Sequence, residues 1–248
     1  MIPTGRRNPL YLFVAPAPMV SLSAELGVYK LKWQPLKCAG VAALAAQIPN
    51  HPSLTQLTLS GVACHNDGAT ALAAAVAQNK RLVSLDVSCN FFTDVGVASF
   101  AAMLAANNST LESLDLSGNR ASDDGVVAIA EGVSCNKTLL SLALNRNNAQ
   151  GGGIGLRGVG ALSSMLSSAS NASVLKELHL WGSNIDDDGA ALLAEGLVEN
   201  ASLETLDIGW NAVGDAGCFA ISEALRRNEV LLRIDLRNNK VRNEQASK

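Results

Sequence analysis

A repeated spacing of leucines runs through most of this chain. The pattern L-x-x-L-x-L, in which Leu, Ile and Val interchange, starts at positions 54, 82, 111, 139, 175, 203 and 231. Five of the six steps between these starts are 28 or 29 residues, and the step from 139 to 175 is 36. One more step of 28 residues back reaches a matching unit at Leu26. The chain is therefore an array of eight units, the last truncated, that bury a core only by stacking on one another.

Each unit predicts a short strand, a turn and an amphipathic helix. An asparagine follows the third apolar residue by three positions, with Gln34, Val62 and Ser183 as departures, at Asn90, Asn119, Asn147, Asn211 and Asn239. A glycine then recurs at a fixed offset: Gly40, Gly68, Gly96, Gly125, Gly189, Gly217. Apolar pairs four residues apart come next and share one helix face: Leu72/Val76, Phe100/Leu104, Leu193/Leu197, Ile221/Leu225. Parallel strands joined by such helices predict a right-handed stack.

Units such as "LESLDLSGNRASDDGVVAIAEGVSCNKT" (residues 111–138) resemble the leucine-rich repeat family, in particular its ribonuclease-inhibitor-like subfamily and the repeat region of NOD-like receptors. The resemblance covers about residues 26 to 242. It implies an α/β fold, a right-handed leucine-rich repeat solenoid or horseshoe with parallel strands on the concave face and helices on the convex face. It also implies that the asparagine column hydrogen-bonds backbone groups at each turn. We expect residues 26–248 to form this domain.

Residues 1–25 follow no repeat. Two arginines, an apolar stretch and Ala15-x-Ala17 loosely resemble a secretory signal, but prolines interrupt the stretch, so an irregular N-terminal segment or cap is favoured. The five cysteines are scattered and never spaced C-x-x-C, which favours a reducing, cytoplasmic compartment over a disulfide framework or a zinc site. No apolar run approaches the roughly 18 residues that span a bilayer.

A glycine-rich insertion around residues 149–158 contains the fingerprint Gly153-x-Gly155-x-x-Gly158 between an apolar run and a helical run. Strand, glycine loop and helix together suggest a dinucleotide-binding turn. However, Gly158 falls at the position of the repeated glycine, and "NRNNAQ" separates the strand from the loop. The stretch is therefore interpreted as a widened loop of the fifth unit, with no NAD or FAD site.

Two other motifs also have a structural explanation. "IDDDG" (residues 185–189) suggests a metal site, but aspartates recur before the other helices at Asp67, Asp94, Asp123, Asp124 and Asp215, which favours helix caps. Glycosylation sequons occur at Asn107, Asn108, Asn136, Asn171 and Asn200, all where a helix ends and a strand begins. Asparagine suits such turns, so the repeat itself accounts for them.

The remaining chemistry of the sequence is sparse. A net charge of −3 and the lack of a basic block predict no nucleic-acid partner. No P-loop and no nucleophile–base pairing is visible, and His51, His65 and His179 are scattered. We therefore expect neither catalysis nor a cofactor, metal or small-molecule site.

Alternate residues of the strands, which face the concave side, carry the variation between units. We expect three tryptophans there, with Phe91 just beyond a strand on the same side: Trp33, Trp181 and Trp210. Trp181 and Trp210 come from neighbouring units and predict one aromatic patch, surrounded by His179, Arg146, Asp207, Asp235 and Arg237. Exposed tryptophan with arginine is typical of an interaction hot spot, although these rings could instead cover the ends of the sheet.

Carboxylates also recur at strand spacing, as Asp86/Asp115 and Asp207/Asp235. They could favour a cationic partner, or nearby cations such as Arg120 and Arg237 could neutralise them.

These features predict a non-enzymatic protein–protein interaction module, a monomer that binds a protein partner on its concave face through Trp181, Trp210, His179 and Arg146, with Asp207, Arg237, Trp33 and Phe91 as further contacts. It could be a regulatory or sensor part of a NOD-like-receptor-type protein. The alternative is a GTPase-activating regulator of a Ran-type small GTPase. Such regulators carry acidic C-terminal tails, whereas this chain ends in "NNKVRNEQASK".

Overall fold

Strands and helices alternate along the chain. The computed structural model describes residues 21–23, 27–106, 110–147, 152–167 and 174–242. Its strands are β1 (Val28–Lys32), β2 (Gln56–Ser60), β3 (Ser84–Asp86), β4 (Ser113–Asp115), β5 (Ser141–Ala143), β6 (Glu177–His179), β7 (Thr205–Asp207) and β8 (Arg233–Asp235). Its helices are α1 (Lys37–Ala45), α2 (Asn66–Gln78), α3 (Asp94–Ala105), α4 (Asp123–Cys135), α5 (Leu156–Ser167), α6 (Asp187–Val198) and α7 (Asp215–Leu225).

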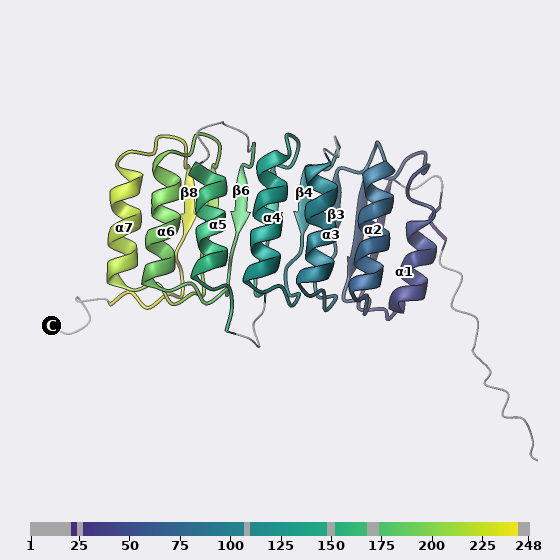
Figure 1. The fold of residues 1–248 in the computed structure, drawn as a ribbon, viewed down its shortest axis with the longest axis horizontal. Helices are drawn as coiled ribbons and strands as arrows, with labels where there is room; N and C mark the ends of the chain where they lie inside the picture. The colour runs from purple at the N-terminus through teal and green to yellow at the C-terminus, as the bar shows by residue number, and fades with distance from the viewer. Residues whose placement is uncertain (1–20, 24–26, 107–109, 148–151, 168–173, 243–248) are drawn as a thin grey trace, which may run out of the picture.

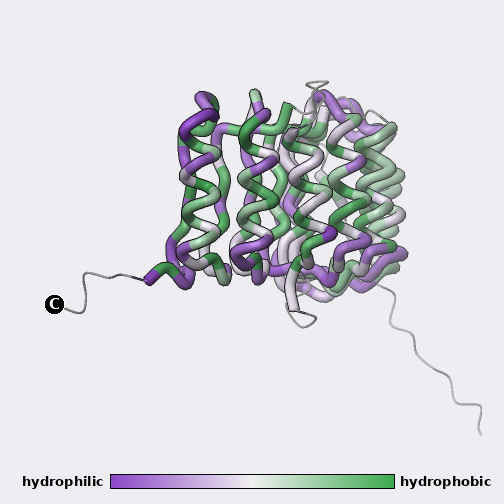
Figure 2. Tube along the Cα trace, turned by 60° about the vertical axis from the view of Figure 1, so that its left-hand side comes forward, coloured by the Kyte–Doolittle hydropathy of each residue, from purple (hydrophilic) through white to green (hydrophobic). Residues whose placement is uncertain are grey.

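The strands form one parallel sheet in chain order from β1 to β8, and the helices form a layer on one face of it (Figure 1). The predicted α/β solenoid is therefore confirmed. The central residue of each short strand pairs with its equivalent in the next unit, as in Leu85–Leu114 and Leu142–Leu178. These leucines are no more than 1% exposed. Apolar stretches run through the strands and helices, and hydrophilic residues gather at the turns (Figure 2).

The asparagine column ladders between units as predicted. Asn119 Nδ2 donates to the Val87 carbonyl of the preceding unit (3.2 Å) and to the Leu116 carbonyl of its own unit (2.8 Å). Its Oδ1 accepts from the backbone N–H groups of Asn90 and Phe92, both at 3.0 Å. A buried turn thereby has its backbone groups satisfied without water. Asn147 differs, because its buried Oδ1 has no hydrogen-bond partner among the described residues.

A second asparagine ladder lies at the opposite edge, where helices lead into strands. Asn136 and Asn200, two of the sequon residues, are 1% and 6% exposed. Asn200 Nδ2 donates to the Leu166 carbonyl (2.9 Å), and its Oδ1 accepts from the Leu203 amide (2.7 Å). Both asparagines thus have a structural role, and their side-chain nitrogens donate to backbone carbonyls in the folded protein. His51 replaces asparagine in this ladder, and its Nδ1 accepts from the Leu54 amide at 3.1 Å. The sequons at Asn107, Asn108 and Asn171 lie outside the described residues.

The aspartates before the helices do cap helices, but mostly those of the next unit. Asp94, the first residue of α3, accepts from the Ser122 and Gly125 amides at the start of α4 (2.7 and 2.9 Å). Asp187 of α6 does the same for Gly214 and Gly217 at the start of α7 (2.6 and 2.8 Å). The predicted capping is therefore present, but the capped helix is mostly that of the next unit, because stacking places the first-turn carboxylate beside it.

Helix α6 is capped by a residue of its own unit. Helix α5 begins with Leu156, which cannot accept a hydrogen bond for α6. The cap of α6 is instead its own Asp186, whose Oδ1 accepts from the Gly189 amide at 3.0 Å. The extra aspartate in "IDDDG" thus compensates for the leucine of the preceding unit.

The expected N-terminal segment lies mostly outside the described residues. Of the part described, Leu22 is buried in the core, and its amide donates to Gln47 Oε1 at 3.0 Å. No helix within the described ranges is long and apolar enough to cross a membrane.

Candidate functional site

The tryptophans do not lie in the strands, as the sequence had suggested, but in the turns that follow them. The second residue after the third apolar position of each unit has a positive φ in all eight units, and we call it the turn position: Trp33, Gly61, Cys89, Gly118, Arg146, Gly182, Trp210 and Asn238. This left-handed conformation ends the strand. Trp33 and Trp210 occupy it, and Trp181 comes one residue before it.

Left-handed backbone suits glycine and costs other residues roughly 1 kcal/mol or more. Trp33, Cys89, Arg146 and Trp210 nevertheless adopt it, with φ between 52° and 57°. From Trp33 to Gly182 a larger residue alternates with glycine, and each of these larger side chains lies on the glycine of the next unit, whereas Trp210 is followed by Asn238. A Cβ at Gly182, for example, would lie 3.0 Å from Arg146 Cγ. Each of these larger side chains thereby packs against the backbone of a glycine.

Three side chains stack across the fifth, sixth and seventh units. The Arg146 guanidinium lies 5.3 Å from the centroid of the Trp181 ring. The Trp181 and Trp210 rings follow, with centroids 5.7 Å apart and an interplanar angle of 49°. Trp210 is 59% exposed, so much of the stack faces solvent. The predicted pairing of the two tryptophans is present in the structure.

A hollow of about 480 Å³ lies beside this stack. We call it the Trp181 hollow; it is lined by Arg146, Gly152, Gly153, Trp181, Gly182, Asn184 and Trp210. The fold thus joins two features that the sequence presented separately, the aromatic patch and the glycine-rich insertion. The first part of that insertion, residues 148–151, lies outside the described residues.

Hydrogen bonds to Ser183 and Asn184 hold the insertion beside the hollow. Where other units have the ladder asparagine, Ser183 has only a hydroxyl, and its backbone carbonyl accepts from the Ile154 amide (2.9 Å). Asn184 Nδ2 donates to the Gly152 carbonyl (2.7 Å). Gly153 packs so closely that a Cβ there would lie 2.6 Å from Asn184 Cβ. Asn184 and Ser183 were not predicted as site residues, although the departure at Ser183 was the available signal.

The glycine fingerprint is not arranged to bind a dinucleotide. Asp123 Oδ1 accepts from the Gly155 amide (2.7 Å), so a carboxylate occupies the N-terminus of α5, where a pyrophosphate would lie. Gly158 packs on the same carboxylate, and a Cβ there would be 2.8 Å from Asp123 Oδ1. Both glycines are therefore explained by unit stacking.

A second stack lies in the N-terminal half, at the same edge of the sheet. The rings of His65 and Phe91 are stacked, with centroids 5.5 Å apart and an interplanar angle of 20°. The Arg120 guanidinium lies 4.7 Å from the Phe91 ring centroid. Phe91 was predicted as a contact, whereas His65 and Arg120 were not. Phe91 and Arg120 are 29 residues apart and occupy the same place in consecutive units. This equivalence is the sequence signal that could have predicted their contact.

Of the other predicted contacts, His179 and Asp207 lie on strands, and Arg237 and Trp33 lie in the turns that follow them. His179 and Asp207 are register neighbours on β6 and β7, with Nδ1 and Oδ2 3.9 Å apart. Arg237 Nε donates to Asp235 Oδ2 at 2.9 Å. Trp33 is 70% exposed and lies on Gly61, far along the sheet from the other tryptophans.

The strand aspartates accept hydrogen bonds from the turns that follow them. In Asp86, Asp115, Asp207 and Asp235 the Oδ1 atom accepts from the backbone amide two residues later, at 2.8 to 3.0 Å. Burial, and to a lesser extent repulsion from Asp86, raises the pKa of Asp115. Lys32 Nζ lies 3.9 Å from Asp86 Oδ2, and Arg120 lies on Phe91 instead of on these carboxylates. The column therefore has a structural role at each turn.

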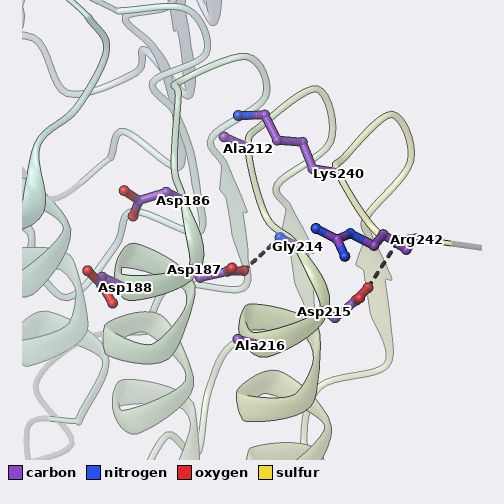
Figure 3. A pocket seen from close by; sticks show the side chains of 9 residues that line it. All are labelled: Asp186, Asp187, Asp188, Ala212, Gly214, Asp215, Ala216, Lys240 and Arg242. Atoms are coloured by element: carbon purple, nitrogen blue, oxygen red, sulfur yellow. Dashed lines mark hydrogen bonds between the residues drawn. The ribbon is translucent and has the colours of Figure 1, made fainter.

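The aspartates of "IDDDG" line an open hollow between the starts of α6 and α7, together with Lys240 and Arg242 (Figure 3). Asp187 points to Gly214, and Asp215 accepts from the Arg242 amide at 3.0 Å (Figure 3). No group of three or more metal-ligating side chains occurs within the described part of the chain. Since Asp186, Asp187 and Asp215 accept from backbone amides, capping explains most of the carboxylates of this hollow.

Comparison with known proteins agrees with this architecture. A family model described as "Leucine Rich repeat" matches residues 78–101, 107–130, 171–194 and 199–222. "NACHT, LRR and PYD domains-containing protein 14" of Mus musculus is 29% identical over 188 residues, which are 75% of this chain and 18% of that protein. "NACHT, LRR and PYD domains-containing protein 12" of Mus musculus is 29% identical over 202 residues, 81% of this chain and 15% of that protein.

The chain therefore carries leucine-rich repeats. Its units are similar to the repeat regions of NOD-like receptors, and it spans less than a fifth of the length of these two relatives. Solved structures similar to it include "Leiomodin-1 Actin-Binding Site 2 (ABS2)", with a TM-score of 0.49 and 21% identity over 61% of this chain and 86% of that one. A "TLR13-ssRNA13 complex" has a TM-score of 0.45 and 17% identity over 91% of this chain and 32% of that one. Leucine-rich repeats of this kind form protein-interaction modules.

Proposed function

We propose that this array is a non-enzymatic interaction module that binds a protein partner at the Trp181 hollow. It would serve as a regulatory or sensor part of a NOD-like-receptor-type protein. The observation that carries the proposal is the solvent-facing stack of Arg146, Trp181 and Trp210 beside the hollow. Exposed tryptophan and arginine at the mouth of a pocket are the side chains that most often anchor protein interfaces.

The backbone holds two members of the stack in place. Arg146 and Trp210 adopt the left-handed conformation that recurs at the turn position of every unit, so the surrounding repeat imposes it. Because the stack stands on a rigid array of paired strands, a partner would meet side chains that are already in place, which lowers the ordering cost of binding.

The test is affinity capture from native lysate, with bound proteins identified by mass spectrometry. Wild type is compared with the double variant Trp181→Ala/Trp210→Ala and with Trp33→Ala, an exposed tryptophan of the same array. Circular dichroism establishes that all three proteins fold. We expect a partner that wild type and Trp33→Ala retain and the double variant loses. Equal retention by all three proteins would contradict the Trp181 hollow as the binding site.

A further inference from the structure

The two stacks occupy consecutive units along the turns at the carboxyl ends of the strands. Together they consist of His65, Phe91, Arg120, Arg146, Trp181 and Trp210, one residue from each of six successive units, and we call this set the aromatic–arginine stripe. Ring or cation–π contacts join His65 to Phe91 and Phe91 to Arg120. Others join Arg146 to Trp181 and Trp181 to Trp210. The turns that carry Arg120 and Arg146 are hydrogen-bonded, since the Gly118 amide donates to the Asn145 carbonyl at 2.7 Å.

The two arginines at the centre of the stripe are available for a partner. Both are exposed, and neither forms an ion pair with a described residue. The arginines Arg157, Arg226, Arg227 and Arg237 are each within ion-pair distance of a carboxylate. A guanidinium placed over an aromatic ring can still donate N–H groups to a partner, and these match the two oxygens of a carboxylate.

We propose that the aromatic–arginine stripe binds an extended acidic peptide segment of a protein partner. Neighbouring carboxylates of that segment would lie on Arg120 and Arg146, and apolar residues on either side of them on Phe91 and on Trp181 with Trp210. From Phe91 to Trp210 the stripe crosses four strand spacings of about 4.8 Å, which an extended peptide spans with about six residues. This inference rests on the proposed function and specifies the partner's chemistry.

The charges around the stripe favour a peptide over single-stranded nucleic acid. Aromatic rings and arginines also bind bases and phosphates. However, the strand aspartates Asp86, Asp115, Asp207 and Asp235 run beside the stripe, and the whole chain has a net charge of −3. A nucleic acid carries a charge at every residue and would meet these carboxylates. A peptide with acidic residues only at its centre places its charges at the two arginines and carries fewer charges past these carboxylates.

The experiment uses defined fluorescein-labelled probes and the full chain. The acidic probe is Leu-Ser-Glu-Asp-Ser-Leu, compared with Leu-Ser-Gln-Asn-Ser-Leu and Leu-Ser-Lys-Lys-Ser-Leu, and oligo-uridine is the nucleic-acid probe. Binding is followed by fluorescence polarisation at two salt concentrations and by the tryptophan emission of the protein. The variants are Arg120→Glu and Arg146→Glu, with Arg227→Glu as the control, because Arg227 lies near Glu199 at the ends of helices.

We expect the acidic probe to bind at least tenfold more tightly than the amide or lysine probes and to weaken with salt. Each stripe variant should lose this preference, and Arg227→Glu should stay within twofold of wild type. Equal binding of the three peptides, no binding of the acidic probe up to about 1 mM, or tighter binding of oligo-uridine would overturn the inference. The proposed function fails separately, when capture of a protein does not depend on Trp181 and Trp210.

Discussion

Trp33 lies flat on Gly61, its equivalent in the next repeat. A Cβ at Gly61 would lie 2.7 Å from Trp33 Cζ3, and the φ of Gly61 is +65°. The pair is one instance of the alternation of bulky residue and glycine at the turn position. The glycine is therefore required twice, for its backbone conformation and for the ring that covers it.

Gly61→Ala should lower the free energy of unfolding by about 2–5 kcal/mol. Roughly 1–2 kcal/mol comes from the left-handed backbone and about 1–3 kcal/mol from displacing the indole. Chemical denaturation of Gly61→Ala, Trp33→Ala and the double variant measures the two contributions. In the double variant the displacement cost disappears and only the backbone cost remains, so strict additivity would show that the ring imposes no steric requirement.

Capping across units predicts that a substitution in one helix destabilises the next. Asp187→Ala removes the acceptor of the Gly214 and Gly217 amides and should cost about 1–2 kcal/mol, with hydrogen exchange increasing at the start of α7. The adjacent Asp188→Ala is the matched control, because Asp188 is exposed, and it should change stability by no more than about 0.5 kcal/mol. Faster exchange at the start of α6 instead of α7 would contradict capping across units.

The asparagine ladder should be weakest beside the insertion. Asn119→Ala leaves the Asn90 and Phe92 amides without an acceptor in a buried turn and should cost about 2–4 kcal/mol. Asn147→Ala removes an oxygen that has no partner within the described residues, so only the two bonds of its Nδ2 are lost and the cost should be smaller. Thermal unfolding of the two variants ranks them, and an equal or larger cost at Asn147 would show that its oxygen is in fact bonded.

Cysteine reactivity should follow burial. Cys64 is buried, and burial, followed by the charges of Cys38 and Asp67, raises the pKa of its thiol to about 12. Cys135 is exposed. Since the thiolate is the reactive form, iodoacetamide at pH 8 should modify Cys135 first and leave Cys64 unmodified while the protein is folded. Mass spectrometry of peptides at successive times tests this order, and modification of Cys64 at the rate of Cys135 would contradict the buried position.

The period of the leucines was enough to predict the strand, turn and helix of each unit, because a stacked array repeats the same burial at the same residues. What it could not predict depended on contacts between units. The partner of Asp94 is a helix 28 residues later, and the sequence does not show which of two helices a first-turn carboxylate faces. Likewise, glycine at positions 61 and 118 is a sequence signal for the left-handed turn. Trp210 and Arg146 adopt the same conformation, but a bulky residue does not predict it.

The Trp181 hollow illustrates the same limit at the candidate site. Trp181 and Trp210 could be paired from the sequence, since they come from consecutive units. The approach of Gly152 and Gly153 to them could not, because it depends on hydrogen bonds that Ser183 and Asn184 make with the insertion. A departure from the repeat and an insertion facing it are separated by about one unit in sequence and become adjacent only when the units stack.

Asp115→Asn should raise the stability of the protein at neutral pH. Burial, followed by Asp86, raises the pKa of Asp115 in the folded protein, so the folded state binds this proton more tightly than the unfolded chain does. Its ionisation therefore costs stability, which is lost as the pH rises from the usual carboxyl pKa through the raised one. Asparagine keeps an oxygen that can accept from the Ser117 amide and removes the charge. Thermal unfolding across pH 3 to 7 should show no advantage of the variant at the acid end, where Asp115 is protonated, and a higher Tm than wild type at pH 7.

Asp235→Asn is the opposite control. Arg237 lowers the pKa of Asp235 to about 2, so loss of this carboxylate should reduce the Tm at pH 7. A lower Tm for Asp115→Asn at pH 7 would show that the hydrogen bond to Ser117 outweighs the burial of the charge.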